Sequence, residues 1–265
     1  MQQPVIIDSH AHLDYPQLAA DLPGVLARAE TAGVRQIISI GVKLSTSHVP
    51  REIAEAHDNV WFSIGVHPHE AANEPLSCDR DAFLAAADHP KCVAIGEAGL
   101  DYFYDYAPRE KQAESFRVQI GVARQLGLPI IVHARDADED IAAIIEDEMT
   151  KGTFSGVLHC FSSGAALARR ALAVGFYISF SGILTFNKAA EIREVAGFAP
   201  VDRILVETDA PFLAPTPHRG KTNEPAFTTH TLARLAEVRG MSVAEMAAQT
   251  TQNTLHLFSR MECAV

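Results

Sequence analysis

Eight short apolar, β-rich runs recur along the 265-residue chain, and stretches with helical spacing and composition lie between them. The runs cover residues 5–8, 36–40, 60–66, 92–96, 129–132, 156–158, 176–180 and 203–206. Because they are apolar almost without interruption, they are expected to be buried on both faces, as in a parallel sheet covered by helices. Eight such units fit either a closed (β/α)8 (TIM) barrel, typically of roughly 250 residues, or a long open doubly wound sheet. We predict the closed barrel.

Helices are predicted between these runs and after the last one. The segments between the runs are 22–32, 79–87, 109–126, 138–148, 165–173 and 189–196. Residues 227–239 and 243–258 are predicted as two closing helices, the second with Ser242 as its N-cap and Glu245 three residues on, the pattern of a capping box. The chain has no internal repeat or Pro/Ser-rich linker, so a single domain over residues 1–265 is the simplest partition.

Histidines and carboxylates stand at the ends of six of the eight runs. They are His10, His12, His67, His69, Glu97, His133, His159, Glu207 and Asp209. Side chains on a strand alternate between faces, so His10 and His12 are expected to point the same way. In an α/β barrel all C-terminal strand ends meet on one face, where active sites lie, and residues far apart in sequence therefore converge there.

Each of these residues also has an ordinary interpretation. A histidine after an apolar strand is often a core residue satisfied by a backbone carbonyl, Glu97 fits an exposed loop, and Asp209 fits a turn cap. Because the ordinary interpretation needs several independent coincidences in one register, we favour a metal site. Its first-choice ligands are His10, His12, Glu97, His133, His159 and Asp209. His67 is assigned to substrate binding instead.

Mixed imidazole and carboxylate ligands suit divalent zinc, manganese, iron or cobalt, and magnesium where carboxylates dominate. Six protein ligands exceed what one ion needs when catalysis also requires open positions. We therefore predict two divalent ions, Mg, Mn or Zn, about 3.5 to 4 Å apart and bridged by a carboxylate, for which Glu97 is the choice. The assignment is His10, His12 and Asp209 to the first ion, and His133 and His159 to the second.

The predicted reaction is metal-assisted hydrolysis, in which a pair of ions lowers the pKa of bound water from about 15.7 toward neutrality. Glu97 and Asp209 are the predicted catalytic residues, and Asp209 accepts the proton of the water. Glu207 is expected to orient a ligand. Cys160, beside His159, is expected to point away from it on the opposite strand face. No Gly-x-Ser-x-Gly elbow or P-loop supports a covalent nucleophile.

The substrate is expected to be anionic. Arg219 and Lys221 lie in a basic stretch after the eighth run, where barrels frequently bind phosphate, although a solvated basic turn explains them equally well. Arg135, two residues beyond His133, offers a guanidinium fork suited to phosphate oxygens. The net charge of −11 argues against a protein that coats long nucleic acids, but it does not exclude a phosphate substrate.

No apolar run approaches the roughly 18 residues of a membrane helix, and no signal-like segment precedes the first strand. We therefore expect a cytoplasmic protein with no membrane partner. A monomer is expected, with an oligomer left open.

The strand-end residues belong to a longer series of motifs. These are Asp-Ser-His-Ala-His-Leu-Asp (8–14), Gly-Val-His-Pro-His (65–69), Gly-Glu-Ala-Gly-Leu-Asp-Tyr (96–102), Pro-Arg-Glu-Lys-Gln (108–112), Val-His-Ala-Arg-Asp-Ala (132–137), His-Cys-Phe-Ser (159–162), Glu-Thr-Asp-Ala-Pro-Phe-Leu-Ala-Pro (207–215), Arg-Gly-Lys-Thr-Asn-Glu-Pro-Ala (219–226) and residues 253–258. In them the chain resembles the TatD family of metal-dependent deoxyribonucleases over essentially its whole length. The family usually has Gly and Arg where this chain has Ser163 and His256.

The resemblance implies a TIM-like barrel with the metal site at the six first-choice ligands. It also implies DNase activity, commonly exonucleolytic from a 3' end and supported by magnesium or another divalent ion. Two other functions stay open. An amidohydrolase, lactonase or small-molecule phosphoesterase on the same barrel is the alternative, because a fold does not determine a function. A non-catalytic metal-binding protein is disfavoured, because structural metal sites tend to be closed.

Overall fold

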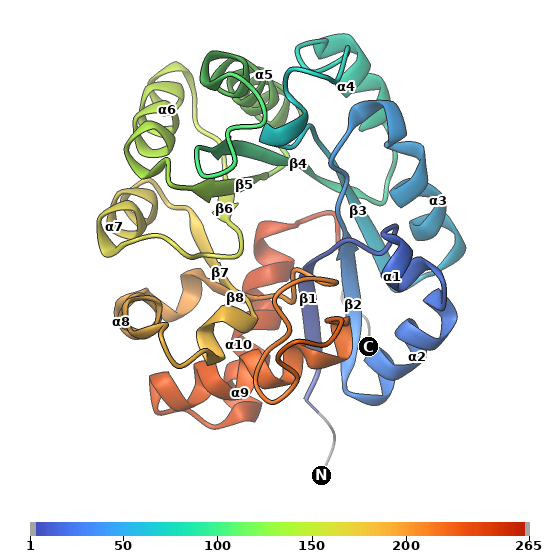
Figure 1. Ribbon diagram of the computed structural model, residues 1–265, viewed down its shortest axis with the longest axis vertical. Coiled ribbons are helices and arrows are strands. Elements are labelled where there is room, and N and C mark those ends of the chain that lie inside the picture. The colour runs from blue at the N-terminus through green and yellow to red at the C-terminus, as the bar shows by residue number, and fades with distance from the viewer. Residues whose placement is uncertain (1–3, 263–265) are drawn as a thin grey trace.

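Eight parallel strands form one sheet in the order of the chain (Figure 1). The computed structural model describes residues 4–262. The strands are β1 (Ile6–Ala11), β2 (Val34–Ser39), β3 (Val60–Ile64), β4 (Cys92–Asp101), β5 (Ile130–Arg135), β6 (Gly156–Leu158), β7 (Tyr177–Phe180) and β8 (Ile204–Val206). Each coincides with one of the predicted runs. The sequential order is that of a barrel, so the open doubly wound alternative is wrong.

The barrel is nearly closed at a seam between β1 and β8. The two ends meet in a parallel bridge between Ala11 and Ala210, and the His12 N–H donates to the Ala210 carbonyl over 2.8 Å. A buried side-chain contact reinforces the seam, because the Asp8 carboxylate accepts hydrogen bonds from the Thr208 hydroxyl (2.6 Å) and backbone N–H (2.9 Å). The seam thus ties together the first and last strands just below their C-terminal ends.

Ten α-helices surround the sheet in the part of the chain that the structure describes (Figure 1). They are α1 (Pro16–Ala19), α2 (Leu22–Thr31), α3 (His48–Ala56), α4 (Arg80–Ala86), α5 (Arg109–Leu126), α6 (Asp138–Lys151), α7 (Ala165–Ala173), α8 (Ala190–Phe198), α9 (Thr228–Arg239) and α10 (Val243–Leu257). All eight predicted helices are present, and Ser242 and Glu245 make the expected capping box. Helices α1 and α3 are additions. None of these helices is long and apolar enough to cross a bilayer.

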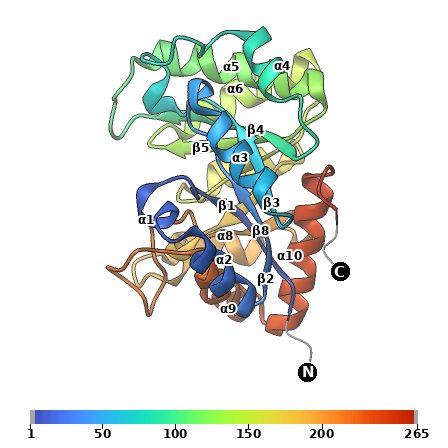
Figure 2. The same cartoon turned by 90° about the vertical axis from the view of Figure 1, so that its right-hand side faces the viewer.

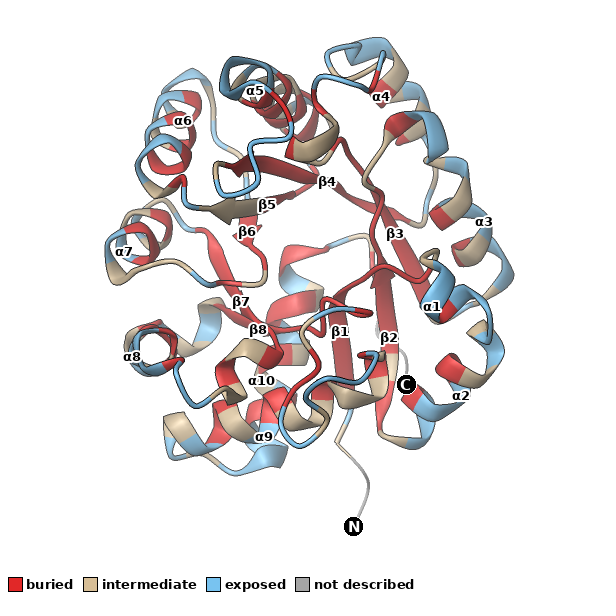
Figure 3. Ribbon diagram, in the orientation of Figure 1, coloured by how far each residue is buried: buried red, intermediate tan, exposed pale blue. Residues whose placement is uncertain are grey.

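Two hydrophobic layers hold the barrel together, and the strands that separate them are buried (Figure 3). The outer layer lies between the sheet and the surrounding helices. The inner layer fills the barrel and includes Ile7, Trp61 and Tyr177, which pack with Leu257 and Phe258 at the end of α10. Apolar area removed from water, at about 25 cal/mol per Å², is the main stabilising contribution of both layers.

Helix α10 covers the N-terminal end of the barrel. The Asn253 amide donates to the carbonyls of Val201 (2.9 Å) and Ile204 (2.8 Å), which lie where β8 begins. Arg260 likewise donates to the Cys92 carbonyl at the start of β4 over 2.8 Å. Figure 2 shows α10 on one side of the barrel and the loops after β4 and β8 on the other. The C-terminal face is therefore the open one.

Candidate metal centre

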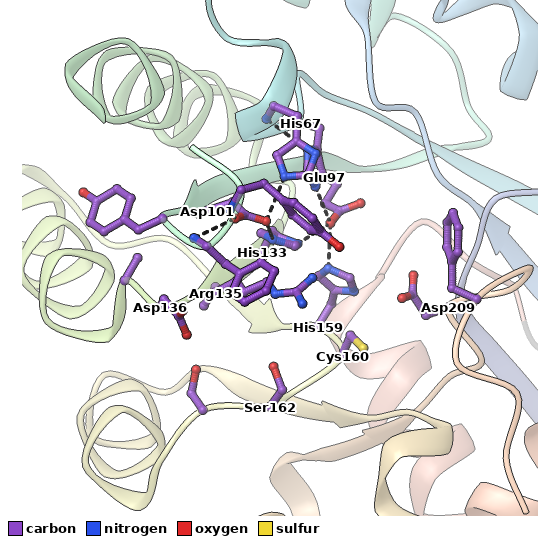
Figure 4. Close-up of a pocket in the computed structure, with 18 of the residues that line it drawn as sticks. His67, Glu97, Asp101, His133, Arg135, Asp136, His159, Cys160, Ser162 and Asp209 are labelled. Carbon is purple, nitrogen blue, oxygen red and sulfur yellow. Dashed lines mark hydrogen bonds and ion pairs between the residues drawn. The ribbon is translucent and has the colours of Figure 1, made fainter. Parts of the chain in front are cut away.

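An open cavity of about 1290 Å³ occupies the C-terminal face of the barrel. Its lining comes from the ends of β1, β4, β5 and β6 and from the loops after β3 and β8. Figure 4 shows His67, Asp101, His133 and His159 gathered around Glu97, with Asp209 across the space from them. The structure thus brings together residues that are up to about two hundred positions apart, as strand ends in a barrel should be.

The two carboxylate oxygens of Glu97 face two different groups of donors. Oε1 lies 2.7 Å from His159 Nε2, 2.9 Å from His133 Nδ1 and 3.4 Å from His67 Nε2. Oε2 lies 3.5 Å from His10 Nε2 and 3.8 Å from His12 Nε2. Glu97 is 2% exposed, so these imidazoles rather than water surround it. A carboxylate can bridge two metal ions when each of its oxygens faces a separate group of metal-binding side chains, and Glu97 has this arrangement.

His10, His12 and Asp209 form the first of these groups. Asp209 Oδ1 is 3.7 Å from His10 Nε2 and 3.4 Å from His12 Nε2, and the two Nε2 atoms are themselves 3.4 Å apart. Two nitrogens that bind one zinc ion at about 2.1 Å with tetrahedral geometry lie roughly 3.4 Å from each other. The spacing and the nitrogen and oxygen donors both fit a divalent cation held among these three residues.

The second group contains His133 and His159, and each of these two rings is oriented by a carboxylate of its own. Glu207 Oε1 lies 3.2 Å from His159 Nδ1, and Asp101 Oδ2 lies 3.1 Å from His133 Nε2. A ring nitrogen whose proton is held by a carboxylate leaves the lone pair of the other nitrogen free for a metal. In the neutral form of each ring, the nitrogens left for a metal would be His159 Nε2 and His133 Nδ1, and both face Glu97 Oε1. These residues also fit a divalent cation.

His67 differs from its neighbours in its tautomer. Its Nδ1 accepts a hydrogen bond of 3.1 Å from the His69 backbone N–H, so the ring proton of the neutral form lies on Nε2, facing Glu97. Burial lowers the pKa of His67 to about 4, and the ring is therefore neutral at neutral pH. A protonated Nε2 has no lone pair for a metal. In this tautomer the His67 Nε2–H faces Glu97 Oε1, and the two heavy atoms are 3.4 Å apart.

The buried carboxylates of the centre are ionised. Burial alone would raise the pKa of Glu97, but the imidazoles of His159 and His67 and the hydrogen bonds to it hold that pKa well below its usual range. Burial would lower the pKa of His159, yet Glu97 and Glu207 raise it well above its usual range. A buried anion of this kind requires positive charge beside it, and a divalent cation supplies such charge.

Asp101 is a member of the site that the sequence did not predict. Its Oδ2 accepts from His133 and, over 2.8 Å, from His69 Nε2. The prediction ended this strand at Gly96, whereas β4 continues to Asp101. The apolar pattern stops at Glu97, and two glycines interrupt it, which hides the strand. One sequence signal could have identified Asp101. Glu97, Gly99 and Asp101 are spaced two apart, so they lie on the same face of a strand.

Gly99 allows β4 to approach β5 closely enough for this network. Its φ is +138°, and a Cβ at this position would lie 2.0 Å from the His133 carbonyl oxygen. A clash of this kind with backbone cannot be relieved by turning a side chain. Any larger residue would displace the strand that carries His133.

Glu207, which follows β8, and Cys160, which lies just beyond β6, are in direct contact. Glu207 makes the expected contact with a candidate ligand, His159, and also accepts a 2.7 Å hydrogen bond from the Cys160 N–H. The expectation that Cys160 points away is wrong, because β6 ends at Leu158 and strand alternation no longer applies. Cys160 has a φ of +43° and lines the cavity, as Figure 4 shows.

The residues predicted to bind substrate fall into two groups. His67 and Arg135 line the cavity. The Arg135 guanidinium lies 4.2 Å from the ring centre of Phe103, and no ion pair to it is present among residues 4–262. Arg219 and Lys221 are exposed and do not line the cavity, and the Arg219 guanidinium packs over a phenylalanine ring, 3.5 Å from its centre. The structure therefore does not bring the basic loop to the candidate centre.

Replacing Asp101 with asparagine is expected to lower kcat/KM and metal affinity by about 10- to 100-fold, the usual effect of losing a carboxylate that orients a metal ligand. The amide nitrogen puts a donor where His133 and His69 each need an acceptor. Metal content by mass spectrometry and steady-state hydrolysis measure the effect. Asp147→Asn, an exposed change on α6, is the control. Unchanged metal affinity in Asp101→Asn would contradict the orienting role.

Comparisons of the sequence with known proteins show the family of this chain. A family model described as "TatD related DNase" matches residues 7–259. The "Uncharacterized metal-dependent hydrolase YcfH" of Escherichia coli (strain K12) is 43% identical over 256 residues, which are 96% of this chain and 95% of that protein. The "3'-5' ssDNA/RNA exonuclease TatD" of Shigella flexneri serotype 5b is 34% identical, covering 96% of this chain and 98% of that protein.

The fold agrees as well. The crystal structure of YJJV, a TatD homologue from Escherichia coli K12, matches with a TM-score of 0.89 at 29% identity, over 96% of this chain and 98% of that chain. Both the sequence and the structural likeness extend over nearly the full length of each protein. The chain therefore belongs to the TatD family of metal-dependent hydrolases.

Proposed function

We propose that this hydrolase is a nuclease that uses two divalent cations to remove nucleotides from the 3' end of a DNA strand. The observation that carries the proposal is the division of donors around Glu97, with each carboxylate oxygen directed at a separate group of imidazoles. Two cations about 4 Å apart are a recurring arrangement in enzymes that cleave phosphodiesters. The relative named as a 3'-5' ssDNA/RNA exonuclease supports the choice of substrate.

His10, His12 and Asp209 would hold the first cation, and His133 and His159 would hold the second, with Glu97 between the two groups. Such cations would neutralise phosphate charge and lower the pKa of a water molecule toward neutrality, so that it could act as the nucleophile. Asp101 and Glu207 orient His133 and His159, and the His67 ring faces Glu97.

Asp209 is the proposed proton acceptor. Burial raises its pKa, but the hydrogen bond from His12 and the nearby His10 and His159 lower it below its usual value, so the group is ionised at neutral pH. Its side chain is 13% exposed, and it borders the cavity, where a water molecule can reach it. An ionised carboxylate within reach of the attacking water meets the requirement for a general base.

Arg135 is the proposed contact to the substrate phosphate. Its planar guanidinium lies against Phe103 and Tyr104, 4.2 Å and 4.8 Å from their ring centres, which holds it at the cavity wall. Because no carboxylate of the described residues pairs with it, its N–H groups are available to phosphate oxygens. The neighbouring wall is acidic and includes Asp136 and Asp140.

The test is digestion of short single-stranded DNA labelled at the 5' end or at the 3' end, with Mg²⁺, Mn²⁺ or Zn²⁺. We expect products that shorten from the 3' end, and a 3'-terminal phosphorothioate linkage should block them. A panel of lactones, amides and simple phosphodiesters runs beside it. Intact DNA at enzyme excess, together with turnover of an amide or lactone, would overturn the proposal in favour of the alternative hydrolase.

A further inference from the structure

Exposed aromatic side chains are concentrated at the mouth of the cavity. Of the six large apolar side chains that are exposed within residues 4–262, four line this cavity. They are Phe103, Tyr104, Tyr106 and Phe212. Tyr106 is 63% exposed and Tyr104 is 44% exposed. Apolar rings gathered at one opening indicate a binding surface.

Tyr104 and Tyr106 are connected to the metal centre through contacts with His69 and Asp101. Their rings stack on each other with centres 5.2 Å apart and planes 22° from parallel. The His69 ring packs edge-on against Tyr106 at 4.8 Å, and His69 Nε2 is bonded to Asp101, which in turn bonds to His133. The Tyr104 N–H also donates to Asp101 over 3.0 Å. The stacked pair therefore has a defined position relative to the reaction site.

A second aromatic surface lies on the other side of Glu97. Phe212 follows Asp209 in the loop after β8, and its ring meets that of Tyr15 edge-on at 5.7 Å. Tyr15 packs against His12 at 4.8 Å. A phosphodiester at the centre would thus have aromatic rings on both sides, next to each of the nucleosides that it joins.

The charges on the cavity wall restrict what these rings can bind. Among the described lining residues Arg135 is the one arginine or lysine, whereas aspartates and glutamates are numerous: Glu70, Glu97, Asp101, Asp136, Asp138, Glu139, Asp140 and Asp209. A long polyanion cannot follow such a wall, because proteins that track a phosphate backbone do so with a basic groove. A flat, uncharged ring can lie on it. Nucleobases have that character, and they stack on tyrosine without regard to sequence.

We propose that Tyr104 and Tyr106 form a base-stacking subsite that holds the unpaired bases of a single strand next to the scissile phosphate, with Phe212 on the opposite side. This inference rests on the proposed nuclease function and deepens it. Arg135, packed on Tyr104, contacts the phosphate beside the stacked base. Bases inside a duplex are not available to these rings, so a paired end must fray before it can bind.

One consequence concerns salt. Each phosphate neutralised by Lys or Arg contributes about −0.7 to the slope of log affinity against log salt for a single strand. With Arg135 as the cationic side chain in the cavity, we expect 1/KM for a single-stranded oligonucleotide to fall with a slope of about −0.7. A slope several times steeper would show that phosphate contacts dominate, and it would overturn the subsite.

The main test combines changes in the protein and in the substrate. Tyr104→Ala/Tyr106→Ala is expected to raise KM for single-stranded DNA about tenfold or more, the range measured for loss of one stacked base, with a smaller effect on kcat. Tyr104→Phe/Tyr106→Phe keeps both rings and should stay within about twofold of wild type. Tyr104→Leu/Tyr106→Leu keeps apolar area without a ring face and should resemble the alanine variant. Val243→Ala, an exposed change on α10, is the remote control.

The substrate arm uses an oligonucleotide whose last three nucleotides lack bases. Wild type should bind it as weakly as the alanine variant binds normal DNA, and the two proteins should then differ little. Metal content, measured for every variant, confirms that the centre is loaded equally. If wild type cleaves DNA and the alanine variant has an unchanged KM, the subsite is refuted while the nuclease function stands. If wild type cleaves no DNA, the nuclease function itself is refuted.

Discussion

Glu97→Ala should lower kcat by about a thousandfold or more while the barrel remains folded. Glu97 is the group whose two oxygens face both donor sets, so in the proposed two-cation centre its loss would remove the bridge and one ligand of each cation. Cations at such sites stabilise the transition state by several kcal/mol, and about 1.4 kcal/mol corresponds to a factor of ten in rate. Steady-state hydrolysis, metal content by mass spectrometry and circular dichroism provide the three measurements.

A matched control separates catalysis from folding. Glu74 is 4% exposed, close to Glu97 in burial, and accepts a hydrogen bond from Ser45 away from the cavity. Glu74→Ala should reduce stability, because it removes the hydrogen bonds that the carboxylate accepts from the Ser45 hydroxyl and N–H, each worth about 1.5 to 3 kcal/mol, and yet retain near-normal kcat. If Glu97→Ala keeps normal activity with full metal content, the bridging role is refuted.

Removal of the metals by a chelator should abolish hydrolysis and also lower the melting temperature. A ligand at a hundred times its Kd stabilises the folded state by about 2.7 kcal/mol. For a domain of this size each kcal/mol is worth about 2 to 4 °C, so we expect a fall of about 5 to 10 °C. The physical reason is that the buried carboxylates Glu97 and Asp209 lose the cations that offset their charge.

Adding one divalent ion at a time to the stripped protein gives the stoichiometry. Two ions per chain with recovery of both activity and melting temperature is the expected result. Protein with Asp209→Asn should lose the first site selectively, because Asp209 contacts His10 and His12 but not His133. Saturation at a single ion in the wild type would contradict a paired centre, and an unchanged melting temperature would show that the cations do not stabilise the fold.

The sequence predicts the fold more completely than it predicts the candidate metal centre. The eight strands are predictable because burial on both faces leaves an unbroken apolar signature, as in 60–66 and 176–180. The donors at the ends of those strands follow from the topology alone, since parallel strands in a barrel end on one face. His10, His12 and Asp209 meet at the seam, although nothing in the local sequence of β1 refers to β8.

Residues beyond the apolar runs are harder to predict. The sequence does not predict Asp101, because Gly96 and Gly99 interrupt the apolar pattern of β4. Gly99 is required by the close approach of this strand to the His133 carbonyl, which only the folded structure shows. The contrast between Arg135 and Arg219 has a similar origin. Both are basic residues that follow a candidate ligand in the sequence, but only the folded chain determines that Phe103 and Tyr104 hold the first at the cavity and that the second packs elsewhere.

The seam between β1 and β8 also determines when this site can exist during protein synthesis. His10 and His12 leave the ribosome with the first strand, whereas Asp209 follows the last, and the Asp8–Thr208 contact that joins the two strands spans 200 residues. A nascent chain that stops short of β8 therefore carries the histidines without their carboxylate partner. The group formed by His10, His12 and Asp209 is therefore complete only when nearly the whole polypeptide has emerged, and incomplete translation products lack it.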